Sequence, residues 1–275
     1  MSWLVDPYES LFMRNAAAAA VIVGVLAPAV GTWIVLRGLA YLGDALSHAT
    51  LGGVAAAYVS GFSLVLGALG AGLVMGALLS VLGGRARLRL DAVIGVVETI
   101  MFALGVVLIA RSPRGVDLTH FLFGQITTVT RGDVAVNAAL AAAALAAVAL
   151  LFRDLRASTF DPVHAAQVGV RVGVMRFALL ALLSVAIVVS LSTVGVLMSV
   201  ALLVTPAATA RLLTNRLTTM TAAAVALGVS ATLSGLTLSY HLSSPPGATI
   251  ALVAAAGFAV VFAATRPRRH RHSPI

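Results

Sequence analysis

The stretch ALSHATLGGVAAAYVSGFSLVLGALGAGLVMGALLSVLGG, residues 45–84, runs for 40 residues without an Asp, Glu, Lys or Arg. A helix needs about 20 apolar residues to cross a bilayer, so the stretch is long enough for two crossings. Near its middle, Ser60-Gly61-Phe62-Ser63 has the small residues of a turn. A backbone inside lipid must satisfy its own hydrogen bonds, which an apolar run of this length does as helix. We therefore predict a pair of membrane-spanning helices here.

The rest of the chain repeats this pattern. Of its 275 residues, 60% are hydrophobic and only 10% are charged. The apolar runs are far longer than the roughly 10-residue alternating strands of outer-membrane barrels. The predicted fold class is therefore all-α, a single polytopic membrane domain over residues 1–275 with about eight or nine transmembrane helices. We expect helices at about 14–36, 40–60, 63–83, 92–110, 133–152, 172–191, 194–213, 218–239 and 248–265.

The uncharged run 177–210 is too long for one crossing and short for two complete ones. Ser192, Thr193 and Gly195 predict a tight turn within it. Pro206 is expected to interrupt the returning helix, because proline removes a backbone donor. A broken helix is tolerated in a membrane where it is packed in protein or lines a cavity.

All 18 cationic residues are arginines, and they fall in loops beside the predicted spans. With an external N-terminus, one side of the membrane carries fourteen of them and the other only Arg14, Arg111, Arg114 and Arg131. The positive-inside rule then favours nine spans and a cytoplasmic C-terminus, or eight if one segment is re-entrant. This distribution accounts for the positive net charge, so nucleic-acid binding is not needed to explain it. The tail at about 266–275 is expected to contact anionic membrane lipids.

The largest predicted cytoplasmic connection is residues 153–172. Within it, Asp161-Pro162 has the pattern of a helix start, with Asp as the cap and Pro at the first helical position. Gly169 is a plausible stop. These residues predict a short helix at about 160–170 on the membrane surface. By loop statistics alone, a plain solvated connector is the simpler interpretation.

Ionisable residues interrupt the apolar sequence at YLGDALSHATLGG, residues 41–53. Asp44 and His48 are four positions apart, so both lie on one face of a helix. They lie about 7 and 13 Å into their span, and Glu98 about 10 Å into its own from the same side. Carboxylate and imidazole without sulfur suit Zn²⁺, Mn²⁺ or Fe²⁺. A packing pair of Asp with His, or a proton relay, remain alternatives.

Two further histidines, His120 and His241, lie in predicted external loops and are candidates for an entrance. An ATPase with a phosphate-binding Walker loop is excluded because that loop requires a lysine, and the chain has none. No His-Glu-x-x-His or Gly-x-Ser-x-Gly motif occurs either. The sequence therefore gives no support to an enzyme.

Six segments, in order, resemble the signatures of the metal-type ABC transporter permeases, the membrane subunits of bacterial zinc and manganese importers. They are YLGDALSHATLGGVAAAYVSG (41–61), AVIGVVETIMFALGVVLIA (92–110), HFLFGQITTVTRGD (120–133), FDPVHAAQVGV (160–170), VGVLMSVALLVTPAATARLL (194–213) and LSYHLSSPPGATIALV (239–253).

This resemblance implies a homodimeric permease in the bacterial plasma membrane, working with a separate ATP-binding cassette subunit and an extracytoplasmic metal-binding protein. It implies no permanently bound cofactor, only transported Zn²⁺ or Mn²⁺. By this resemblance, Asp44 and His48 correspond to the family's metal ligands in the permeation pathway. The 160–170 segment would be the coupling helix, including Phe160, Asp161, Pro162, Gln167 and Gly169.

The chain departs from the family pattern at Glu98, where an apolar residue is common. It departs also at His241, where an aromatic residue is common, and at Gly52, where proline is common. An ion- or proton-coupled secondary transporter is the second hypothesis, although no internal symmetry between the halves supports it. A structural membrane scaffold is the third. The sequence leaves the choice between zinc and manganese open.

Overall fold

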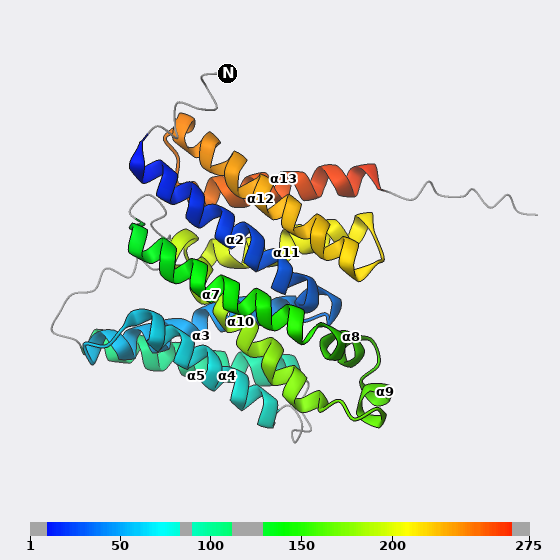
Figure 1. Ribbon diagram of the computed structural model, residues 1–275. Helices are drawn as coiled ribbons and strands as arrows, with labels where there is room; N and C mark the ends of the chain where they lie inside the picture. Colours follow the sequence, from blue (N-terminus) through cyan, green and yellow to red (C-terminus); the bar gives the residue numbers. More distant parts are fainter. Residues whose placement is uncertain (1–9, 83–89, 112–128, 266–275) are drawn as a thin grey trace, which may run out of the picture.

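The computed structural model describes residues 10–82, 90–111 and 129–265, and in these ranges every regular element is a helix (Figure 1). The long helices run along one common direction, and two short ones lie at one end. They are α2 (Leu11–Leu36), α3 (Ala40–Val59), α4 (Leu64–Leu82), α5 (Leu90–Ala110), α7 (Arg131–Leu150), α8 (Phe152–Phe160), α9 (Pro162–Gln167), α10 (Val172–Val194), α11 (Val196–Leu213), α12 (Leu217–Leu242) and α13 (Pro246–Ala264).

The polytopic helical bundle predicted from the sequence is confirmed. Seven helices of the described chain are long and apolar enough to cross a membrane, and the apolar part of α11, Met198–Leu213, is shorter. α3 has 20 residues and packs between α4 and α5, so it extends through the same layer. Its apolar character is diluted by the polar residues of the candidate site. The long helices begin and end within a few residues of the predicted bounds.

The centre of the bundle is formed by α2 and α10. In each, 72% of the most apolar 18-residue segment is buried inside the protein, compared with 22% for α5, α7 and α13. α2 packs against α7, α10, α11 and α12. A membrane helix that is buried on all sides cannot be recognised from a polar stripe, because its neighbours are as apolar as lipid. The central position of these two helices is therefore a result of the tertiary structure.

The chain reverses between α10 and α11 at a single residue, Gly195, with φ +89°. This confirms a tight turn, although Ser192 and Thr193 lie inside the end of α10. The expected interruption at Pro206 is wrong, because α11 continues through it from Val196 to Leu213. Proline is tolerated inside a membrane helix where neighbouring groups compensate for the missing donor.

At one end of the bundle, the connection between α7 and α10 folds into α8 and α9. Asp161 caps α9 by accepting a hydrogen bond from His164 N at 2.9 Å, and Pro162 is its first residue. The stop at Gly169 has φ +88°. The predicted short helix is therefore confirmed, with the shorter extent Pro162–Gln167. α8 was not expected, since residues 153–160 were predicted as a connector.

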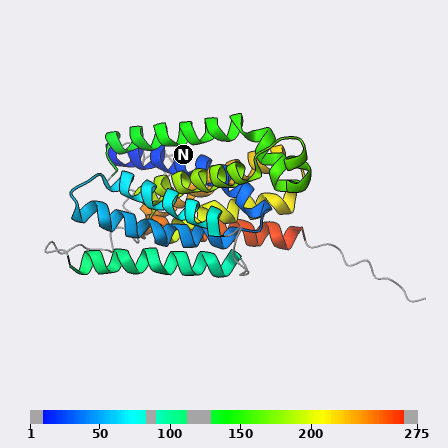
Figure 2. The same ribbon diagram turned by 90° about the horizontal axis from the view of Figure 1, so that it is seen from below.

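α5 lies at one edge of the bundle beside α3, which also packs on α4, and α7 lies at the opposite edge (Figure 2). α3 and α5 touch at two glycines, Gly52 and Gly105. A Cβ on Gly52 would collide with the main-chain oxygen of Met101, and one on Gly105 would lie 2.6 Å from the Cα of Gly52. Backbones that approach this closely need small residues at the crossing. This crossing brings the polar residues of α3 and α5 together.

Candidate functional site

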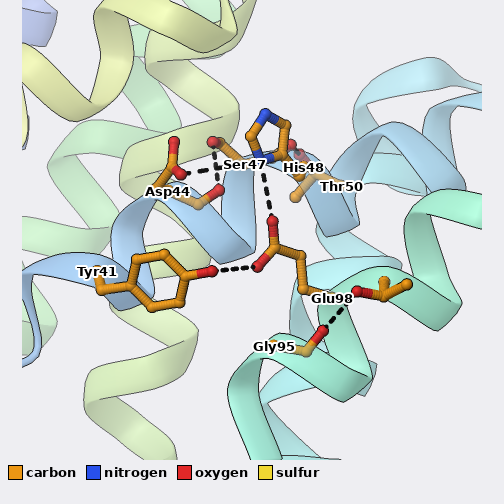
Figure 3. Close-up of polar contacts among 8 residues, drawn as sticks. Tyr41, Asp44, Ser47, His48, Thr50, Gly95 and Glu98 are labelled. Carbon is orange, nitrogen blue, oxygen red and sulfur yellow. Dashed lines mark hydrogen bonds and ion pairs between the residues drawn. The ribbon is translucent and has the colours of Figure 1, made fainter. Parts of the chain in front are cut away.

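Asp44 and His48 lie on one face of α3, as their spacing predicts. His48 Nδ1 is 4.0 Å from Asp44 Oδ2 (Figure 3). His48 is eight residues into α3, and Glu98 is eight residues into α5, so each lies about 12 Å along its helix. The two helices therefore present these side chains at a similar depth.

Glu98 connects the two helices through both of its carboxylate oxygens. Oε1 is 3.1 Å from His48 Nδ1, and Oε2 accepts a hydrogen bond from the Tyr41 hydroxyl at 3.1 Å. With the proton placed on Nδ1, His48 donates to Glu98, and Nε2 is the unprotonated nitrogen. Glu98 thus contacts His48, while the roles of Asp44, His48 and Glu98 as metal ligands stay a prediction.

The imidazole of His48 is fixed on a second side by Phe102, one turn beyond Glu98 on α5. The two rings meet edge to face, with centroids 5.8 Å apart. In Figure 3, Nδ1 faces the carboxylates while the other ring nitrogen points away from Glu98. A histidine oriented in this way offers Nε2 to a ligand, because Nδ1 is already engaged.

Ser47 and Thr50 have local structural roles. The Ser47 hydroxyl donates to Asp44 O at 2.7 Å, and the Thr50 hydroxyl donates to Ser47 O at 2.7 Å. Both side chains are fully buried. Hydroxyls bonded to their own helix backbone commonly serve packing in membrane helices. These contacts indicate a packing role for both residues.

The cluster is partly exposed on the surface of this single chain. The side chains of Asp44, His48 and Glu98 are 43%, 29% and 15% exposed. Within the ranges 10–82, 90–111 and 129–265, no three His, Asp or Glu side chains are arranged to hold a metal ion. Charged side chains at membrane depth face a cavity or another protein rather than lipid. The described residues leave this face of α3 and α5 partly uncovered.

Two other histidines were predicted as parts of an entrance. His120, like the tail at 266–275, lies outside the described residues. His241 lies in the last turn of α12 with its ring 5.4 Å from that of Tyr240. α12 packs against α2, α11 and α13. The entrance role of His120 and His241 thus remains a prediction.

Phe102 and Tyr41 were not among the residues predicted for the site. Both could have been found by spacing, since Phe102 is four residues after Glu98 and Tyr41 three before Asp44. Residues three and four apart share a helix face. What spacing could not show is that these faces of α3 and α5 meet.

A bundle of membrane-spanning helices with an acid–histidine cluster at membrane depth, and a capped short helix at one end, has the features of a membrane permease. Comparison with known proteins supports this class. The sequence profile of the ABC 3 transport family matches residues 9–265. The chain belongs to this family and is an integral membrane permease of the metal ABC transporters.

Individual relatives agree along nearly the whole chain. The manganese transport system membrane protein MntC of Halalkalibacterium halodurans is 40% identical, covering 91% of this chain and 86% of its own. The manganese import system permease protein ScaB of Streptococcus parasanguinis is 37% identical, covering 95% and 94%. A solved structure of PsaBC from Streptococcus pneumoniae in complex with Fab contains a chain with TM-score 0.86, 34% identity, and coverage of 95% and 94%.

Proposed function

We propose that two copies of this chain form the path through which an ABC importer carries Mn²⁺ across the bacterial plasma membrane. The observation that carries the proposal is the Asp44–His48 pair, partly exposed at membrane depth on a face that the described residues leave partly uncovered. A dication inside a bilayer needs protein groups to replace its hydration waters. One carboxylate and one imidazole from each copy would provide four such groups.

A second copy would supply donor groups that the described part of one chain does not bring together. Asp44 lies on the Nδ1 side of His48, while Nε2 points away from Glu98. A two-fold partner facing α3 and α5 would add its own pair and shield the charges from lipid. The resulting site holds the ion loosely, since a path must release what it binds.

Manganese is the proposed cargo on two grounds. The relatives MntC and ScaB are named as manganese permeases. The donors are carboxylate oxygen and imidazole nitrogen with no thiolate, because the chain contains no cysteine. This donor set suits Mn²⁺, although Zn²⁺ accepts it as well.

The end that carries α8 and α9 would be cytoplasmic and receive the ATP-binding cassette subunit. Phe160 and Val163 are 60% and 69% exposed there, an apolar surface beside the capped start of α9. We assign this coupling contact to Phe160, Asp161, Pro162, Gln167 and Gly169. An extracytoplasmic metal-binding protein would deliver the ion at the opposite end, and ATP binding would switch access between the two sides.

The test is uptake of radioactive Mn²⁺ into proteoliposomes containing the permease with its ATPase subunit. We expect uptake that requires ATP hydrolysis and that excess unlabelled Mn²⁺ suppresses more strongly than Zn²⁺. Stronger suppression by Zn²⁺ would reassign the cargo to zinc. Uptake that continues with a hydrolysis-deficient ATPase subunit would contradict an ABC importer and favour a secondary transporter.

Glu98 is proposed to position His48 rather than to bind the ion, because its two oxygens are engaged by His48 and Tyr41. The variant Glu98→Ala is expected to lower Mn²⁺ uptake about 10- to 100-fold, the usual cost of removing a partner of a metal-binding histidine. Glu98→Gln keeps an oxygen that accepts from Nδ1, so it should retain most of the uptake. The measurement is the initial uptake rate at equal amounts of assembled transporter.

An equal loss in Glu98→Gln and Glu98→Ala would instead make the carboxylate a direct ligand. Tyr41→Phe serves as the matched variant, because it removes one hydrogen bond to Glu98 and leaves His48 bound. Its loss should be smaller than that of Glu98→Ala.

A further inference from the structure

Arg37 lies in the short connection between α2 and α3. α2 ends at Leu36 and α3 begins at Ala40. The connection is closed by backbone hydrogen bonds from Gly38 N to Val35 O at 3.1 Å and from Leu39 N to Ile34 O at 3.0 Å. Gly38 has φ +67°, a conformation that residues with a Cβ rarely adopt. A connection this short and hydrogen-bonded transmits a displacement of Arg37 to the first turn of α3.

The side chain of Arg37 reaches across to the last turn of α8. Its Nε donates to Thr159 Oγ1 and its Nη2 donates to Ser158 Oγ, both at 3.0 Å. Both hydroxyls in turn donate to Leu155 O, which fixes the direction of their lone pairs. The contact therefore joins residues separated by more than 120 positions in the sequence.

This contact lies directly beside the start of α9. Thr159 is two residues before Asp161, whose carboxylate caps α9 through His164 N. On its other side, Arg37 is seven residues before Asp44 and in the connection that leads into α3. A continuous series of hydrogen bonds and short backbone segments thus runs from α9 to the helix that carries the acid–histidine cluster.

The contact is made to neutral hydroxyl groups. Among the described residues, Arg37 has no carboxylate within ion-pair distance, and its partners are neutral hydroxyls. Burial, and then the neighbouring positive charge of Arg176, lower the pKa of Arg37 from its usual value. Hydrogen bonds donated by a charged guanidinium are stronger than those between two neutral groups. The two hydroxyls therefore hold Arg37 against the last turn of α8.

We propose that Arg37 is the positioning residue that links the α8–α9 end to α3, so that a movement of α9 changes the position of Asp44 and His48. The inference rests on the proposed function, since it assumes an ATPase subunit that acts on α9. In one position of α9, Arg37 is held by Ser158 and Thr159. When α9 moves, the pull on Arg37 turns or shifts the first turn of α3 and alters access to the cluster.

The test compares two activities of the same assembled transporter, ATP hydrolysis and Mn²⁺ uptake. Arg37→Gln is expected to lower Mn²⁺ uptake about tenfold while ATP hydrolysis stays within about twofold, a separation typical of lost coupling between sites. Arg211→Gln is the matched control: an exposed arginine in the last turn of α11, with the same change of charge. It should alter neither activity.

A reporter on α3 separates coupling from a merely structural role. The chain has no cysteine, so Val59→Cys, at the exposed end of α3, accepts a single spin label. We expect the label's spectrum to change between ATP-bound and nucleotide-free transporter, and this change to disappear in Arg37→Gln. If Arg37→Gln does not assemble, Thr159→Val together with Ser158→Ala removes the same two acceptors and should give the same result.

The proposal is overturned if uptake is unchanged, if uptake and ATP hydrolysis fall together, or if the label still responds to ATP in the variants. These outcomes are distinct from failure of the proposed metal site. If Asp44 and His48 can be replaced without loss of uptake but Arg37→Gln abolishes the spectral change, the metal assignment fails and the link stands.

Discussion

Replacement of Asp44 and His48 together by alanine is expected to lower Mn²⁺ uptake about 100-fold or more. Mutating a residue that hydrogen-bonds to a metal ligand typically lowers metal affinity or activity 10- to 100-fold. Removing the ligand itself should lower uptake by at least as much. The double variant also removes the charge that offsets the burial of a dication at membrane depth. The measurement is the initial rate of uptake into proteoliposomes that contain equal amounts of permease and ATPase subunit.

The control is Thr99→Val, next to Glu98 on α5. The Thr99 hydroxyl is exposed and donates to Gly95 O of its own helix, so its removal leaves the cluster intact. Uptake should be close to that of the parent. Unchanged uptake in the Asp44 and His48 double variant would contradict their assignment as metal ligands. It would favour a packing role for the pair.

Gly52→Ala is expected to destabilise the protein by about 1–3 kcal/mol, the usual cost of forcing extra volume into a packed interior. The new Cβ would collide with the main-chain oxygen of Met101, which cannot move without moving α5. Glu98 lies one turn before Met101, so uptake should fall as well. The midpoint of thermal unfolding in detergent measures the first effect, and Mn²⁺ uptake measures the second.

The matched control for this variant is Gly95→Ala on α5. A Cβ at Gly95 has no neighbouring atom within 4 Å in the described structure. Replacing a helical glycine with alanine where space allows stabilises by about 0.4–1 kcal/mol. Equal unfolding midpoints for the Gly52→Ala and Gly95→Ala proteins would contradict the close α3–α5 crossing.

The long helices could be predicted because membrane insertion depends on local properties. A run of about 20 apolar residues is sufficient for a crossing, whatever it packs against. The same local reasoning found the Asp161 cap and Pro162 start of α9, since a cap is made within one turn of helix. It failed at Pro206, because whether a proline breaks a membrane helix depends on its neighbours.

The candidate site was predicted only in part. Spacing on one helix placed Asp44 with His48, and equal depth suggested that Glu98 lay in the same layer. Depth gives the position of a side chain only along the membrane normal. Many side chains lie at the same depth without touching one another. That Glu98 contacts His48 and Tyr41 depends on the side-by-side packing of α3 and α5, which Gly52 and Gly105 allow.

By itself, the sequence determined that this protein is a helical membrane bundle, where its helices lie along the chain, and which residues carry charge at membrane depth. These follow from the cost of placing polar groups in lipid, which each segment meets alone. Only the tertiary structure decided that α2 and α10 are central, that Glu98 holds His48, and that Arg37 joins α8 to the start of α3. Such contacts join residues distant in sequence, and in lipid they depend on the fit between helix surfaces rather than on hydrophobicity.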